Sequence, residues 1–171
     1  MSSCQTVVVR SASELQAGDH ISWLTPLSSV GGTVGTVPRH HAIVVAWQGG
    51  NEVKLIHVII AGLRDSVVQS ALSADAACGT GMASAVANAQ VVENVQKLKN
   101  LADGTVYKYV YTPGSCSEPF EVIQNARSKI GSFPFDIHNN NCGHFARWCK
   151  YGNIISYRTV RGSDVTSCVC M

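Results

Sequence analysis

The strongest constraint on the fold of this chain is a pair of apolar segments, residues 40–47 and 52–60, separated by Gly49-Gly50-Asn51. Both segments are rich in β-branched and apolar residues, which is typical of buried strands. Glycine and asparagine tolerate the positive φ angles of a tight hairpin turn. The sequence therefore predicts an antiparallel hairpin, and with it an antiparallel sheet.

A second segment, residues 139–152, places a cysteine at the start of a predicted helix. Three asparagines precede Cys142, and asparagine is a favoured N-cap because its side-chain oxygen accepts an unpaired backbone N–H. Gly152 closes the segment, as glycine commonly does at helix ends. Backbone N–H groups and the helix dipole stabilise a thiolate in a first helical turn. Cys142 is therefore the candidate nucleophile, whereas an inert buried thiol is the interpretation favoured for Cys149.

The remaining segments complete the predicted fold. Periodicity and turn residues predict strands at 4–10, 21–24, 106–111 and 154–160, a helix over 117–130, a helix or strand over 91–101, and a covering loop over 61–90. This order predicts an α+β fold, an antiparallel sheet with helices packed on one side.

Composition excludes several classes of function. A chain of 171 residues with a formal charge of +2 and no lysine or arginine cluster is not expected to bind nucleic acid. It shows no signal-peptide pattern and no apolar run of the roughly 18 residues that a membrane span needs. The seven cysteines form no CxxC pair, so we expect no metal site and no cofactor. These features favour a cytoplasmic protein.

Two histidines of the predicted hairpin are the candidate partners of the cysteine. His40 and His57 lie on adjacent strands and can project from one face of the sheet. One imidazole can accept the thiol proton while the second fixes the tautomer of the first, as in catalytic triads. Taken singly, a histidine on an apolar strand is more often a hydrogen-bonded core residue.

These residues resemble the lecithin:retinol acyltransferase-like proteins, which include the small phospholipase A/acyltransferases and belong to the wider NlpC/P60 group of papain-like folds in circularly permuted order. The similarity runs from about Glu14 to Gly152. It is carried by Gly18-Asp19-His20-Ile21, His40-His41-Ala42-Ile43, Ile56-His57, Asn141-Cys142 with His144-Phe145, and Tyr151-Gly152. The resemblance implies that Cys142 is the nucleophile, that His40 rather than His41 is its base, and that His57 is the third member of the site.

The chain departs from the family pattern beside the nucleophile. The family usually carries glutamate there, whereas this chain has Gly143. The lost carboxylate is expected to alter the protonation of the thiol or the orientation of the substrate.

The last four residues, Cys168-Val169-Cys170-Met171, fit the C-a-a-X pattern, and methionine at X points to farnesylation of Cys168. The sequence therefore predicts a single catalytic domain over residues 1–160 and a flexible tail over 161–171 that contacts membranes through a lipid. The alternative is a tail that merely contains cysteines.

The resemblance implies a thiol-dependent phospholipase or acyltransferase. Cys142 would take an acyl group from a phospholipid as a thioester and pass it to an amine, alcohol, lysolipid or water. Two alternatives remain open at this stage. One is a cysteine peptidase or amidase on the same scaffold, and the other is a membrane-associated regulatory protein whose catalysis is impaired at Gly143.

Overall fold

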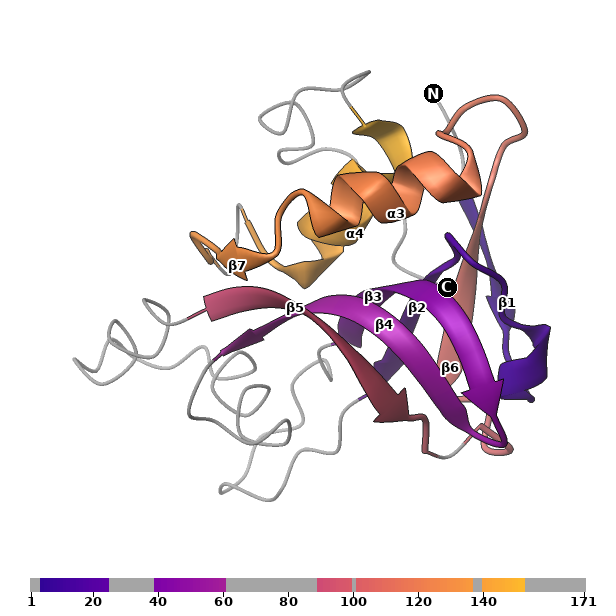
Figure 1. Cartoon of the computed structure of the whole chain (residues 1–171). Helices are drawn as coiled ribbons and strands as arrows, with labels where there is room; N and C mark the ends of the chain where they lie inside the picture. Colours follow the sequence, from indigo (N-terminus) through magenta and orange to yellow (C-terminus); the bar gives the residue numbers. More distant parts are fainter. Residues whose placement is uncertain (1–3, 25–38, 61–88, 100, 137–139, 153–171) are drawn as a thin grey trace, which may run out of the picture.

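A seven-stranded antiparallel sheet forms the framework of the computed structural model, in which residues 4–24, 39–60, 89–99, 101–136 and 140–152 are described (Figure 1). Its strand order is β1-β6-β2-β3-β4-β5-β7. The strands are β1 (Cys4–Val8), β2 (His20–Leu24), β3 (Arg39–Gly49), β4 (Glu52–Ile60), β5 (Ala89–Lys97), β6 (Val106–Tyr111) and β7 (Gly131–Ser132). The helical elements are η1 (Ala12–Glu14), a 3-10 turn, and the α-helices α3 (Pro119–Arg127) and α4 (Cys142–Tyr151). The predicted α+β class is confirmed.

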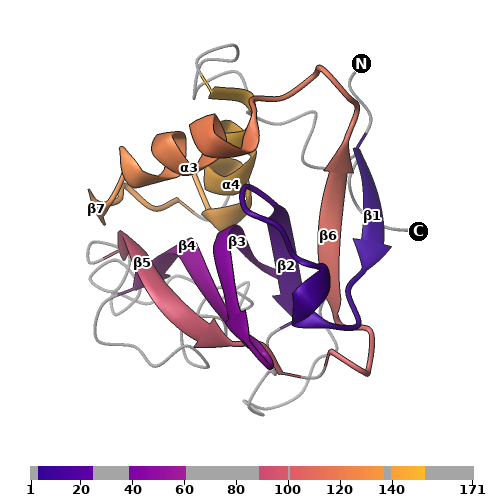
Figure 2. The same ribbon diagram turned by 45° about the vertical axis from the view of Figure 1, so that its right-hand side comes forward.

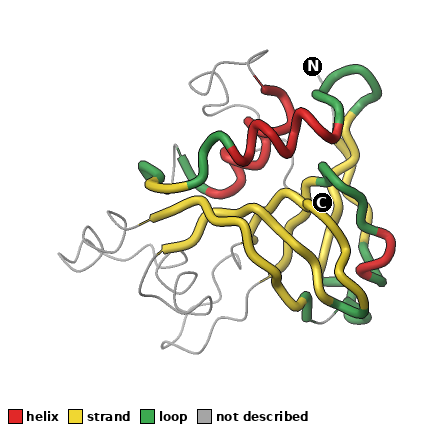
Figure 3. The backbone as a smooth tube through the Cα atoms, in the orientation of Figure 1, coloured by secondary structure: helices red, strands yellow, loops and turns green. Residues whose placement is uncertain are grey.

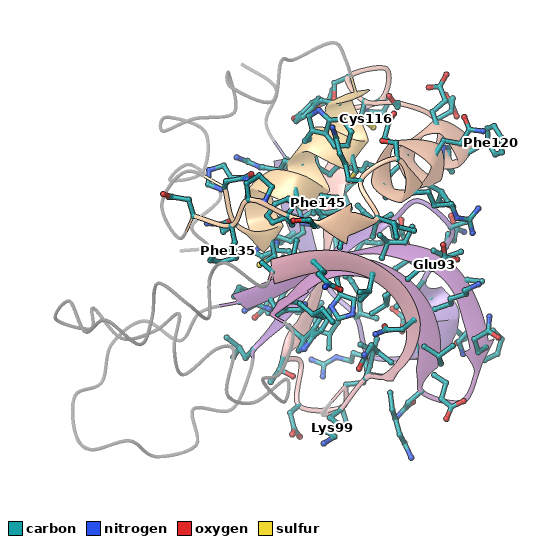
Figure 4. All side chains as sticks on the ribbon, turned by 60° about the vertical axis from the view of Figure 1, so that its left-hand side comes forward. Glu93, Lys99, Cys116, Phe120, Phe135 and Phe145 are labelled. Carbon is teal, nitrogen blue, oxygen red and sulfur yellow. The ribbon has the colours of Figure 1, made fainter. Side chains whose placement is uncertain are left out.

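Both α-helices cover the same face of the sheet, which we call the helix face (Figures 1 and 3). Ile43 and Ile56 are directly paired in β3 and β4, and they pack with Phe145 of α4 in one buried cluster. Figure 4 shows Phe145 between α4 and the sheet. The prediction that helices pack on one side is therefore confirmed.

The other side of the sheet, which we call the opposite face, has a core of its own. Its central residues are Ala42, Val44 and Leu55, and they pack with Val9 and Leu15 from the segments flanking η1. Because side chains alternate along a strand, neighbouring residues of β3 belong to different cores. This alternation decides which histidine faces which side.

Local sequence explains most of these elements. Gly49 and Gly50 adopt φ angles of 110° and 52° in the β3–β4 turn, as the predicted hairpin requires. Pro119 occupies the first turn of α3, where its missing N–H costs nothing. Residues 89–97, for which the sequence left helix, strand or loop open, form β5. The predicted loop at 61–88, the strand at 154–160 and the tail at 161–171 with Cys168 lie outside the described residues and stay predictions.

Gly18 holds the turn before β2 against the start of α3. Its φ is +81°, and a Cβ there would lie only 2.7 Å from the Cα of Pro119. We expect Gly18→Ala to lower the free energy of unfolding by about 2–4 kcal/mol, because a strained φ and a backbone clash act together. Chemical denaturation measures this loss.

Gly114 offers the matched control, since its φ is +75° and a Cβ there meets no atom of the described residues within 4 Å. Gly114→Ala should therefore cost only about 1 kcal/mol. Equal losses for the two variants would mean that the contact with Pro119 is unimportant.

Glu93 of β5 links three elements on the helix face (Figure 4). Arg127 of α3 donates two hydrogen bonds to its carboxylate, at 2.8 and 2.9 Å, and Lys54 Nζ of β4 lies 2.9 Å from Oε1. The hydrogen bond from Arg127, with a further one from Lys54, lowers the pKa of Glu93 from 4.5 to about 2 against the opposing effect of burial.

A carboxyl whose pKa is lower in the folded state stabilises the protein above its unfolded pKa, and the stabilisation disappears as the pH falls through the folded value. We therefore expect thermal stability to fall between pH 4.5 and 2, and to fall less in Glu93→Gln. Thermal unfolding followed by circular dichroism measures both. Glu52→Gln, which changes an exposed glutamate of the hairpin, is the control. The same pH profile in Glu93→Gln as in the wild type would contradict this assignment.

Candidate functional site

Cys142 is the first residue of α4, and Asn141 caps the helix as predicted. The Asn141 Oδ1 accepts the backbone N–H groups of Gly143 and His144, at 2.9 and 3.2 Å. The N–H of Cys142 donates to no oxygen among the described residues and acts on the residue's own sulfur. Cys142 as a whole is only 7% exposed.

The Cys142 thiol contacts the backbone of β3 near the start of that strand. Its Sγ lies 3.9 Å from the carbonyl oxygen of Arg39, and the backbone N–H of His41 also acts on the sulfur and lowers the pKa of the thiol. These two backbone groups stand on either side of His40. The thiol therefore lies at the level of the strand, beside the backbone of His40.

The sheet is open where the thiol enters it. The backbone N–H and C=O groups of successive residues in a strand point to opposite sides. Val44 donates its N–H to Asp19, on the β2 side of β3. The N–H and C=O groups of residues 39 and 41 therefore point to the other side, toward β4. The pairing of β3 with β4 nevertheless ends at Ala42 and His57. Beyond that pair, β3 stays with β2 and β4 stays with β5. We call this gap the β3–β4 opening, and the Cys142 thiol lies in it.

His40 and His57 form one hydrogen-bonded pair. His40 Nε2 lies 2.7 Å from His57 Nδ1, and His57 Nε2 lies 3.1 Å from Oδ1 of Asn94, which also accepts from Gln96 Nε2. An amide oxygen can only accept, so His57 carries its proton on Nε2 and accepts on Nδ1. His40 then donates from Nε2, which leaves a lone pair on its Nδ1.

The structure brings the two predicted histidines together but places them on the opposite face. His40 pairs across the sheet with Trp23, and His57 pairs with Ala42, whose side chain belongs to the opposite-face core. The prediction that His40 and His57 project from one face of the sheet is confirmed, but α4 covers the other face. Cys142 reaches the backbone of β3 on either side of His40 through the β3–β4 opening. In the described part of the chain, the thiol makes no hydrogen bond to an imidazole ring.

A second pair of imidazoles lies on the helix face, and sequence reasoning did not find it. His41 Nδ1 lies 2.9 Å from His20 Nε2, and His20 Nδ1 lies 2.7 Å from the hydroxyl of Tyr111. The His20 ring also stacks on Tyr109, with centroids 4.2 Å apart. Figure 2 shows α4 over this side of the sheet. The alternation of polar and aromatic residues on β2 and β6 was the available signal.

Comparison of the chain with known protein families gives a match. The lecithin retinol acyltransferase family model matches residues 13–155, which include both histidine pairs and the cysteine helix. The chain belongs to the lecithin retinol acyltransferase family. Membership indicates acyltransferase-type chemistry. Neither the comparison with curated proteins nor the comparison with solved structures gave a match.

Two further searches of the described residues concern metals and membranes. No group of three or more potential metal ligands is found among them. They also contain no helix of the length and apolar character that crossing a bilayer requires.

The glycine that replaces the usual family glutamate lies beside His41 in this acyltransferase-family chain. A Cβ on Gly143 would lie 3.4 Å from His41 Nε2 and 3.2 Å from Asn141 Oδ1. A side chain at position 143 would therefore press against the His41 ring or its neighbours. The glycine leaves Nε2 of His41 uncovered on the side of the helix terminus.

Burial keeps the thiol and its neighbouring imidazole neutral. It raises the pKa of Cys142 above 9.0, although the backbone N–H groups of His41 and Gly143 act in the other direction. Burial, followed by the charge of His57, holds the pKa of His40 well below 6.5. These directions favour the neutral thiol over the thiolate expected from the helix terminus.

We expect the alkylation of Cys142 by iodoacetamide to follow this protonation state. Because only the thiolate is a strong nucleophile, the rate should rise through pH 9 and above. Peptide mass spectrometry assigns the label to Cys142 and separates it from Cys4 and Cys116. A rate that is already maximal below pH 7 would instead show a preformed thiolate–imidazolium pair.

Proposed function

We propose that the chain is a thiol acyltransferase or phospholipase that carries its acyl group on Cys142. The observation that supports this best is the position of the thiol in the β3–β4 opening, at the backbone of β3 on either side of His40. The hydrogen-bond chain through His57 to Asn94 leaves His40 Nδ1 as an acceptor. A neutral thiol and an imidazole with an available lone pair are the groups from which nucleophilic catalysis by cysteine starts.

The first half-reaction forms a thioester. As the sulfur of Cys142 attacks the ester carbonyl carbon of a phospholipid, its proton passes to Nδ1 of His40. The carbonyl oxygen becomes an oxyanion, and the backbone N–H of Cys142 can donate to it. The carbon–oxygen ester bond then breaks, and His40 returns the proton to the departing lysolipid oxygen.

The second half-reaction releases the acyl group. An amine, alcohol, lysolipid or water gives its proton to His40 as it attacks the thioester carbon. The carbon–sulfur bond breaks, and the sulfur regains its proton from His40. The same imidazole thus acts as base and acid in turn.

His57 and Asn94 are assigned positioning roles in this mechanism. When His40 gains a proton on Nδ1, its Nε2–H still donates to His57 Nδ1 at 2.7 Å. The Asn94 oxygen keeps the proton of His57 on Nε2, so the His57 nitrogen that faces His40 remains an acceptor. The pair therefore keeps the tautomer of His40 that leaves Nδ1 available to the thiol.

Phosphatidylcholine vesicles labelled in the acyl chain test the proposal, with and without a primary amine as acceptor. We expect labelled fatty acid without the amine and labelled amide with it, both lost in Cys142→Ala. Cleavage of peptides or simple amides in place of the lipid ester would favour the peptidase alternative. Inactivity toward the lipid, a peptide panel and an activated ester alike would favour the regulatory alternative.

A further inference from the structure

The proposed mechanism does not use the hydrogen-bonded pair of His20 and His41. His20 is 1% exposed, and its ring nitrogens contact His41 and Tyr111. His41 is partly exposed, in contrast to His40 at 7%. The remaining nitrogen of His41, Nε2, hydrogen-bonds to none of the described residues. A polar atom is therefore presented at the start of α4, next to the nucleophile.

His41 Nε2 lies close to the place where the oxygen of the reacting carbonyl is expected. It lies 3.4 Å from the point where a Cβ on Gly143 would stand. Gly143 directly follows Cys142, whose own N–H donates to no oxygen among the described residues. An acyl carbonyl bonded to the sulfur would point its oxygen toward this helix terminus, where an anion is favoured. His41 Nε2 and the Cys142 N–H thus border the same small space.

The charges around His41 indicate whether its ring can act as a base or as a hydrogen-bond donor. The cations Arg39 and Arg147 both act on its ring, and His144 is also close. Together with burial, which is the larger cause, they lower the pKa of His41 to about 3. A neutral imidazole in a positive environment is a poor proton acceptor. It is a suitable hydrogen-bond donor to an oxyanion, as neutral imidazoles are in other enzymes.

The hydrogen-bond chain can supply the required tautomer. If the Tyr111 hydroxyl donates to His20 Nδ1, then His20 Nε2–H donates to His41 Nδ1. His41 then carries its own proton on Nε2, directed toward the start of α4. Both nitrogens of His20 and Nδ1 of His41 are then hydrogen-bonded, Nε2 of His41 carries a proton, and no ring is charged.

We propose that His41 is the second oxyanion donor of this site: its Nε2–H and the backbone N–H of Cys142 together bind the carbonyl oxygen as it becomes negative during acyl transfer. His20 and Tyr111 are positioning residues that hold His41 in the donating tautomer. This inference rests on the function proposed above, and it gives His40 and His41 separate roles from the two faces of the sheet.

Two reactions of Cys142 separate an oxyanion donor from a base. Acylation by p-nitrophenyl butyrate passes through a tetrahedral oxyanion, whereas alkylation by iodoacetamide does not. Removing one oxyanion donor typically lowers the rate by about 10²–10³-fold. We therefore expect His41→Phe to slow the acylation burst by this factor with KM little changed, while its alkylation rate stays at the wild-type value. His40→Ala should slow both reactions.

His41→Gln and Tyr111→Phe complete the experiment. Glutamine restores an N–H donor, so part of the acylation rate should return. Without the Tyr111 hydroxyl, His41 is no longer held in the tautomer that carries its proton on Nε2. The acylation burst should therefore slow by a smaller factor, again without a change in the alkylation rate. Circular dichroism checks the fold of each variant. If the two His41 variants do not fold, Tyr111→Phe alone tests the proposal. It is expected to fold because Tyr111 is separated from the site by two hydrogen bonds.

The outcomes distinguish this inference from the function on which it rests. A wild-type protein that is alkylated at Cys142 but gives no acylation burst would overturn both. A normal burst in the wild type that is equally fast in His41→Phe would overturn only the role of His41. Parallel losses of acylation and alkylation in His41→Phe would also overturn it, since they would assign His41 to proton transfer or to the shape of the site.

Discussion

Replacing Cys142 with serine is expected to lower acyl transfer by roughly 10³–10⁶-fold, the range found when a catalytic nucleophile is removed. The thiol lies in the β3–β4 opening between the backbone groups of Arg39 and His41. Serine fits that space, but its hydroxyl is far less acidic than a thiol and is poorly matched to a Cys–His site. The measurement is the rate of fatty acid release from phosphatidylcholine vesicles.

Cys149 provides the matched control because it lies on the same helix and is fully buried. Burial raises the pKa of its thiol well above 9.0, and it packs in the helix-face core. Cys149→Ala should retain most of the activity and lose only stability, since alanine leaves a small cavity. Robust turnover by Cys142→Ser, together with an inactive Cys149→Ala, would show that Cys142 is not the nucleophile.

The second large effect is expected for His40. His40→Ala should lower kcat by about 10²–10⁴-fold, the usual contribution of a positioned general base. His57→Phe should have a smaller effect, since it removes the partner that fixes the tautomer but leaves the base in place. Steady-state kinetics with an activated ester measure both variants.

Imidazole in the buffer distinguishes the loss of a base from a structural defect. If His40 transfers the proton, added imidazole should restore part of the activity of His40→Ala and none of that of Cys142→Ser. A folded His40→Ala variant with near wild-type alkylation and acylation rates would mean that the base is elsewhere. His41 would then be the first candidate, since it lies on the face that α4 covers.

Much of the fold follows from short-range patterns. The two strands joined by Gly49 and Gly50 have local signals of composition and turn chemistry, and so does the helix with Pro119 at its start. β5 did not have such a signal, because Val91–Lys97 mixes apolar and polar residues without a clean period. Its conformation is settled by antiparallel pairing with β4 along its whole length, which is a long-range interaction.

The candidate site residues could be named from the sequence, but their arrangement could not. The resemblance to the family motifs pointed to Cys142, His40 and His57, whereas the side of the sheet on which each imidazole lies depends on register with β2 and β4. The separation of β3 from β4 beyond Ala42 is likewise invisible in a single sequence. The neutral state of the thiol depends on burial, which is a property of the assembled core.

The most direct measurement is the mass of the protein after brief incubation with phosphatidylcholine vesicles of a single acyl chain length, followed by acid quenching and peptide mapping. We predict a fraction of the protein heavier by one acyl group, removable by hydroxylamine and located on the peptide that contains Cys142. Lipid hydrolysis with no acyl group on Cys142, or with the acyl group on another residue, would contradict the thioester mechanism.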